Sequence, residues 1–183
     1  MKIKANSAIA LVGPSGSGKS TIANLIARFY DVNEGKILIG GVDIKNIKKE
    51  ELMNTVSYVF QNSKLLKTSI YENVRMVQQD VYLFAGTIMD NIAYGKPGAT
   101  KEEVIEALHL AQCDDIIEKM PDGIDTQIGS KGVYFSGGEV QRINIARVIL
   151  KNSKIVILDE ATAFADPENE TKVQKAFENL GKN

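Results

Sequence analysis

The stretch Gly13-Pro-Ser-Gly-Ser-Gly-Lys-Ser20 is the most informative part of this sequence. It matches the pattern G-x-x-x-x-G-K-[ST], whose glycines let the backbone turn so that successive N–H groups point at a phosphate. The apolar run Ser7–Val12 before it predicts a buried strand, and a helical pattern begins at Lys19. We therefore expect a phosphate-binding loop in which Lys19 reaches the β- and γ-phosphates and the Ser20 hydroxyl takes one Mg²⁺ position.

The rest of the chain alternates strand and helix patterns. Strands are expected at Lys36–Ile39, before a Gly40-Gly41 hairpin turn, at Val56–Phe60 and at Lys154–Leu158. Helices are expected at Lys48–Asn54, Thr100–Cys113 and Gly137–Leu150, and from Pro167 onward. This alternation predicts an α/β fold with a mainly parallel central sheet, and 183 residues fit one domain.

An acidic pair follows the last expected strand. Asp159 and Glu160 come directly after the apolar residues Lys154–Leu158. A strand beside the loop strand would place Asp159 near Mg²⁺, usually through water, and Glu160 where it polarises an attacking water.

Composition excludes several other classes of protein. The 22 basic and 23 acidic residues nearly cancel, so no broad surface for nucleic acid is expected. The single cysteine, Cys113, excludes an internal disulfide framework and is expected to be a small buried residue on a helix. No apolar run approaches the ~20 residues that cross a bilayer, and no secretion signal precedes Ser7, so a cytoplasmic location is expected.

The stretch Phe135-Ser-Gly-Gly-Glu-Val-Gln-Arg142 resembles the signature of the ATP-binding cassette (ABC) family, usually Leu-Ser-Gly-Gly-Gln. The resemblance covers nearly the whole chain, and Asn91–Gly95 and Asp125–Gly132 resemble exporter-type cassettes. In that family two cassettes form a head-to-tail dimer, and the signature of one closes on the γ-phosphate held by the other. Ser136 and two glycines at a helix start suit such an anion site, whereas Glu139 adds negative charge beside it.

The resemblance implies which residues form the site, with ATP as substrate and Mg²⁺ as cofactor. Nucleotide binding falls to the loop residues Gly13, Pro14, Ser15, Gly16, Ser17, Gly18, Lys19, Ser20 and Thr21. Catalysis falls to Glu160 and a Q-loop glutamine, Gln61 or Gln79, and metal contacts fall to Ser20, Asp159 and the same glutamines. The contacts made in trans fall to Ser136, Gly137, Gly138 and Glu139, with Asp166 in the D-loop.

Two parts of the family pattern are missing from this sequence. The family's switch histidine should follow the last helix, but the only histidine, His109, lies in the expected helix Thr100–Cys113, where a structural role is expected. Only six residues precede Ser7, so the family's adenine-stacking aromatic has no place there. These features predict a cassette truncated at both ends.

The Q-loop region is duplicated. Residues 58–74 resemble residues 76–92, pairing Gln61 with Gln79 and Asn73 with Asn91. We interpret the repeat as a fusion of the front half of one cassette with the back half of a related one; the alternative is an insertion that happens to resemble its neighbour. Residues 1–183 are thus read as a single partial cassette, with a helical subdomain at about 62–150.

The leading hypothesis is the ATP-hydrolysing subunit of an ABC exporter. Its partners would be a transmembrane domain, which holds it at the inner face of the cell membrane, and a second cassette, in a homodimer or heterodimer; nucleic acid is not expected. The alternative is a nucleotide-binding remnant or hybrid fragment that binds ATP without efficient hydrolysis. A kinase or non-transport cassette is disfavoured by the signature and the exporter-like segments.

Overall fold

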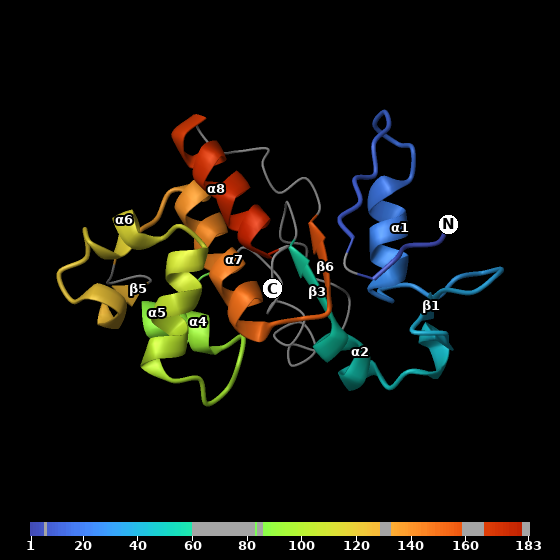
Figure 1. Cartoon of the computed structure of the whole chain (residues 1–183), viewed down its shortest axis with the longest axis horizontal. Helices are drawn as coiled ribbons and strands as arrows, with labels where there is room; N and C mark the ends of the chain where they lie inside the picture. Colours follow the sequence, from blue (N-terminus) through green and yellow to red (C-terminus); the bar gives the residue numbers. More distant parts are fainter. Residues whose placement is uncertain (6, 60–82, 84–85, 129–132, 159–166, 181–183) are drawn as a thin grey trace. The chain divides into compact units, whose positions relative to one another are not determined.

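The computed structural model describes residues 1–5, 7–59, 83, 86–128, 133–158 and 167–180. It divides into two compact units (Figure 1). The first comprises residues 1–58 and 153–159, and the second comprises residues 59–152 and 160–183. Gln61, Gln79, Asp159, Glu160 and Asp166 lie outside the described residues, as does most of the repeat.

The first unit carries the phosphate loop and two small sheets, each of two strands. Its elements are α1 (Lys19–Ile26), β1 (Leu38–Ile39), β2 (Val42–Asp43), the 3₁₀ turn η1 (Ile44–Asn46), α2 (Lys49–Thr55), β3 (Val56–Val59, the last residue excepted) and β6 (Ile155–Leu158). β1 and β2 form the predicted antiparallel hairpin, with Ile39 opposite Val42. β3 and β6 pair side by side and run in the same direction, as Figure 1 shows. Ile44, Leu52 and Val56 form the small buried core of this unit, and Ile155 and Ile157 of β6 pack against it.

The second unit is mainly helical. Its elements are β4 (Gly86–Thr87), α4 (Ile88–Ala93), α5 (Lys101–Leu110), α6 (Asp114–Ile117), η2 (Gly123–Asp125), β5 (Gln127–Ile128), α7 (Gly137–Lys151) and α8 (Pro167–Leu180). α7 packs against α4, α5 and α8, so it forms the centre of this unit (Figure 1). Fully buried residues such as Ile88, Ile92 and Ile143 fill the core between these helices.

Local sequence explains where these helices begin. Thr87, Thr100 and Ser136 each start a helix with a capping box, in which the hydroxyl accepts from the backbone N–H three residues on and an acidic side chain returns to the cap. The helices expected at Lys48–Asn54, Thr100–Cys113, Gly137–Leu150 and from Pro167 are all confirmed, within a few residues at their ends.

The strand expected at Ser7–Val12 is wrong. These residues form no regular structure, and among the described residues they pair with no strand. A strand exists only where a neighbour supplies the other half of the hydrogen-bond ladder, and an apolar run by itself does not provide one. Val12 consequently has 92% of its surface exposed.

Cys113 is buried, as expected, but it lies at the N-cap of α6 and not within a helix, because α5 ends at Leu110. Burial raises the pKa of its thiol to about 12. His109 lies on α5 with an exposed side chain, and its Nδ1 is 3.0 Å from Oδ2 of Asp114.

Candidate nucleotide-binding site

The phosphate loop is shaped by its backbone. Gly16 and Gly18 have φ angles of 80° and 87°, in the left-handed region that other residues rarely adopt. The N–H of Ser17 donates to the carbonyl oxygen of Pro14 (3.2 Å), which closes a tight turn. Gly18 is the N-cap of α1 and has no side chain to bond the first-turn N–H groups. The loop therefore leads into a helix start whose positive end suits a phosphate.

The side chain of Lys19 spans this loop. Its Nζ donates to the carbonyl oxygens of Gly13 (2.9 Å) and Pro14 (3.0 Å), and these bonds are exposed to solvent. The ammonium group is thus held at the loop that its charge would serve. Ser20, the next residue, is exposed. Its hydroxyl oxygen is a ligand of the kind that Mg²⁺ prefers.

The residues that follow the loop helix are fixed to β3 and to η1. α1 ends at Ile26, so Phe29 lies beyond it, and the Phe29 ring packs on Tyr58 of β3 with 5.5 Å between ring centroids. Arg28, which has a φ of 56°, donates from Nη1 to the carbonyl oxygens of Ile44 (2.9 Å) and Ile47 (3.1 Å). These contacts set the direction of α1, and with it the direction of the loop.

β6 ends at Leu158, immediately before the acidic pair. Ile155, Val156 and Ile157 are partly buried, and Leu158 is exposed. β6 pairs with β3, and the hydroxyl oxygens of Ser57 in β3 and of Ser153, two residues before β6, lie 2.6 Å apart. Among the residues that the structure describes, no three His, Cys, Asp or Glu side chains gather into a metal-binding group. The roles expected for Asp159 and Glu160 stay predictions.

The signature lies at the N-terminus of α7, in the second unit. Ser136 is the N-cap, and Ser136 and Gly137 are exposed while Gly138 is buried. The Glu139 carboxylate accepts from the backbone N–H of Ser136 (2.8 Å), and the Glu139 N–H donates to Oγ of Ser136 (3.4 Å). An exposed helix start bearing a hydroxyl is a suitable anion site, and the negative charge of Glu139 lies beside it.

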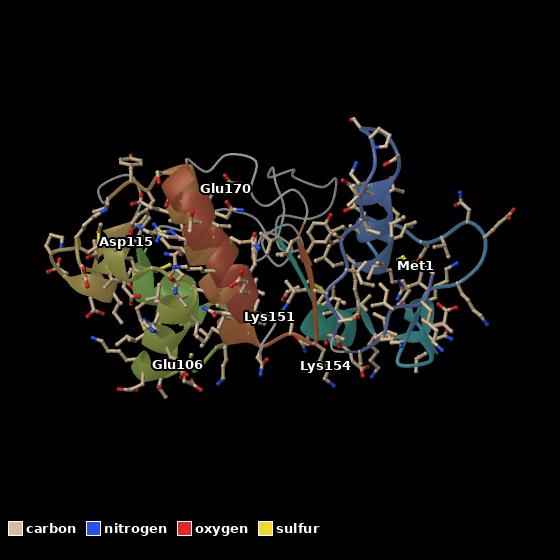
Figure 2. The ribbon with its side chains drawn as sticks, turned by 45° about the horizontal axis from the view of Figure 1, so that its top comes forward. Met1, Glu106, Asp115, Lys151, Lys154 and Glu170 are labelled. Carbon is tan, nitrogen blue, oxygen red and sulfur yellow. The ribbon has the colours of Figure 1, made fainter. Side chains whose placement is uncertain are left out.

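Two buried arginines of α7 were not anticipated from the sequence. Arg147 donates from Nε to the carbonyl oxygen of Asn91 (2.7 Å), and from Nη2 to Oδ1 of Asn91 (2.7 Å). Burial lowers its pKa to about 10, so it stays charged at neutral pH. Arg142 bonds Asp115 on α6, which Figure 2 labels. The only sequence signal was two arginines five residues apart in the mainly apolar residues 142–150.

Asp115 is held in its charged form. Burial disfavours its ionisation, but hydrogen bonds from Arg142 and Lys172 outweigh burial and hold the pKa of Asp115 well below its usual range. The separations are 2.6 Å from Arg142 Nη1 to Oδ1 and 2.8 Å from Lys172 Nζ to Oδ2. Because Lys172 belongs to α8, this carboxylate joins three helices.

A phosphate loop opening a helix, a parallel strand pair and a helical unit with a capped signature define a P-loop nucleotide-binding domain. The sequence model of the ABC transporter family matches residues 1–163, and the chain belongs to that family. Among the residues that the structure describes, no helix is both long and apolar enough to cross a membrane.

Several known proteins are similar to this chain. It is 45% identical over 182 residues to the putative multidrug export ATP-binding/permease protein YgaD of Bacillus subtilis. It is 44% identical over 183 residues to the ATP-dependent lipid A-core flippase of Desulfotalea psychrophila. A solved bacterial Atm1-family ABC exporter with ATP bound superposes on 97% of the chain with a TM-score of 0.78 and 41% identity. The chain spans 28% of the length of YgaD and of the Atm1-family protein, and 29% of the flippase.

Proposed function

We propose that this chain is the ATP-binding and ATP-hydrolysing part of an ABC exporter and drives transport through a transmembrane partner at the inner face of the cell membrane. The observation that carries the proposal is the phosphate loop at the start of α1, in a chain that also presents a capped signature helix. The names of its relatives, which include an export protein, a flippase and an exporter, support the direction of transport.

The loop residues Gly13–Thr21 would bind the ATP phosphates. The left-handed glycines direct backbone N–H groups toward the β-phosphate, and Lys19 contributes a positive charge at the β- and γ-phosphates. Mg²⁺ bound with ATP neutralises charge on those phosphates. Ser20 and Asp159 would hold it, with a Q-loop glutamine, Gln61 or Gln79, and Glu160 would orient the attacking water.

The signature would act on the ATP of a second cassette. Ser136, Gly137 and Gly138 lie at the N-terminus of a 15-residue helix, where a helix dipole favours negative charge. Closing this surface over a γ-phosphate held by another chain requires a dimer, either of two identical chains or with another cassette. Asp166 would lie in the D-loop of this chain.

We also propose that residues 1–183 form a single partial cassette domain, with a helical subdomain at about 62–150.

The test is phosphate release by the purified chain with MgATP, compared with the Glu160→Gln and Lys19→Ala variants. We expect release by the wild-type chain, loss of release with retained ATP binding in Glu160→Gln, and loss of binding in Lys19→Ala. Equal release by wild type and Glu160→Gln would contradict hydrolysis at this site. ATP binding without release would favour a nucleotide-binding remnant.

A further inference from the structure

The second glycine of the signature is in close contact with helix α8. A Cβ added at Gly138 would lie 2.8 Å from Cβ and 2.9 Å from Cγ of Asn169. Real Cβ atoms essentially never come so close, and Cβ of Asn169 is fixed to its own backbone. A side chain at position 138 would therefore push α7 and α8 apart. Asn169 on α8 therefore leaves no room for a residue larger than glycine at position 138.

The same asparagine also bonds the signature helix. Oδ1 of Asn169 accepts from Nη2 of Arg142 at 3.0 Å, one turn after Gly138 on α7. The Arg142 side chain is 1% exposed, and its Nη1 donates to Oδ1 of Asp115 and to the carbonyl oxygen of Gln112. The Arg142 guanidinium is therefore held by acceptors on three different residues. Because it is held in place, it also restricts the position of the Asn169 side chain that accepts from it.

A second contact joins α8 to the same cluster. Lys172, three residues after Asn169, donates to Oδ2 of Asp115 at 2.8 Å, and Figure 2 shows where Asp115 lies. The N-terminal half of α8 thus meets α7 through one packing contact and one hydrogen bond, and meets Asp115 of α6 through a second polar contact. α8 begins at Pro167, the residue after Asp166. In the sequence, the helix that carries Asn169 and Lys172 therefore follows directly on the segment that carries Asp159 and Glu160.

We propose that Asn169 and Arg142 are positioning residues for ATP hydrolysis, which hold the signature surface of Ser136 and Gly137 at a fixed place relative to α8. This inference rests on the proposed function, because the signature matters only if it closes on a nucleotide. Asn169 would not contact the nucleotide. It acts through the position of the α7 N-terminus.

The test compares two asparagines of α8 in the full chain. Asn169→Ala removes the contact with the signature helix, whereas Asn179→Ala removes a similar bond, from Nδ2 to the Leu110 carbonyl oxygen (2.8 Å), away from the signature. Displacement of a reacting group by ~1 Å can cost ~100-fold in rate, so we expect kcat to fall about tenfold or more in Asn169→Ala. In both variants the Kd for MgATP should stay within about twofold of the wild-type value. In Asn179→Ala, kcat should also stay within about twofold of the wild-type value. Equal kcat values in the two variants would overturn the proposal.

A paired substitution tests whether the contact with Asn169 is the reason for the glycine. Gly138→Ala should abolish most turnover, and Gly138→Ala with Asn169→Gly, which removes the clashing Cβ, should regain the rate of Asn169→Ala. A pair as slow as Gly138→Ala would overturn the proposal, because the loss would then not come from the contact between position 138 and Asn169. Unfolding midpoints identify variants that do not fold, and the two alanine variants then decide. Absence of phosphate release from the wild-type chain would instead reject the proposed function.

Discussion

The carboxylate of Glu139 turns back toward the residue that begins its own helix. It accepts a hydrogen bond from the N–H of Ser136 and so completes the capping box of α7. This bond stabilises the helix start, and the same negative charge opposes an approaching phosphate. One residue thus favours the fold of the signature and disfavours its proposed ligand.

Glu139→Gln should separate these two effects. Glutamine also completes a capping box, while one negative charge is removed from the anion site. We introduce Glu139→Gln into the Glu160→Gln chain, and we expect the Kd of its ATP-dependent dimerisation to fall about fivefold. The reason is that the repulsion between two unit charges in water is worth ~1 kcal/mol. Sedimentation over an ATP titration measures it. Glu103→Gln, in the capping box of α5, is the matched control, and an equal response in both variants would contradict the role given to Glu139.

At the scale of elements, α4 is attached to α7 by a polar contact inside an apolar core. Asn91 is 2% exposed and Arg147 is 3% exposed, and both oxygens of Asn91 accept from the same guanidinium. Ile88 and Ile92 pack around the contact. Because a buried charge depends on its full set of acceptors, this contact fixes the register of α4 on α7.

Asn91→Ala should therefore destabilise the chain strongly. It leaves Nη2 of Arg147 without its acceptor from Asn91, and losing one partner of a buried charged group costs about 3 kcal/mol. Urea unfolding followed by circular dichroism measures the change. The exposed Asn46 provides the control, since Asn46→Ala should change the free energy of unfolding by less than about 0.5 kcal/mol. Similar losses in the two variants would show that the Asn91 contact is not energetically important.

The helix cluster at Asp115 should make stability depend on pH. The pKa of the Asp115 carboxyl is lower in the folded chain than its unfolded value of about 3.9. Its contribution to the free energy of unfolding is therefore present above that pH and is lost as the pH falls through the folded pKa. Stability should therefore decline below about pH 4, and Asp115→Asn should flatten this decline. Chemical unfolding between neutral and acidic pH tests it, with Asp122→Asn as an exposed control. An unchanged slope in Asp115→Asn would contradict the assignment.

Local patterns predicted much of the fold, and distant contacts were not predictable. The phosphate loop and the starts of α5, α7 and α8 follow from residues a few positions apart, so the sequence shows them directly. The strand at Ser7–Val12 depends on a partner elsewhere, and the apolar run alone gave a wrong prediction. The bond from Arg142 to Asn169 joins residues 27 positions apart, and no periodicity in the sequence indicates it.

At the scale of the molecule, the two halves of the proposed chemistry lie in different units of the chain. The phosphate loop belongs to residues 1–58, and the signature belongs to residues 59–152. In the proposed dimer, each complete site takes its loop from one chain and its signature from the other. A defect in the loop and a defect in the signature should then be able to complement each other.

The most direct measurement is phosphate release by a mixture of Lys19→Ala and Ser136→Arg chains. Each variant alone should be inactive, since every dimer then lacks either both loops or both signatures. In an equal mixture, half of the dimers hold one intact site of two, so the rate should recover to about a quarter of the wild-type rate. A mixture no more active than its two components would contradict an ATP site shared between two chains.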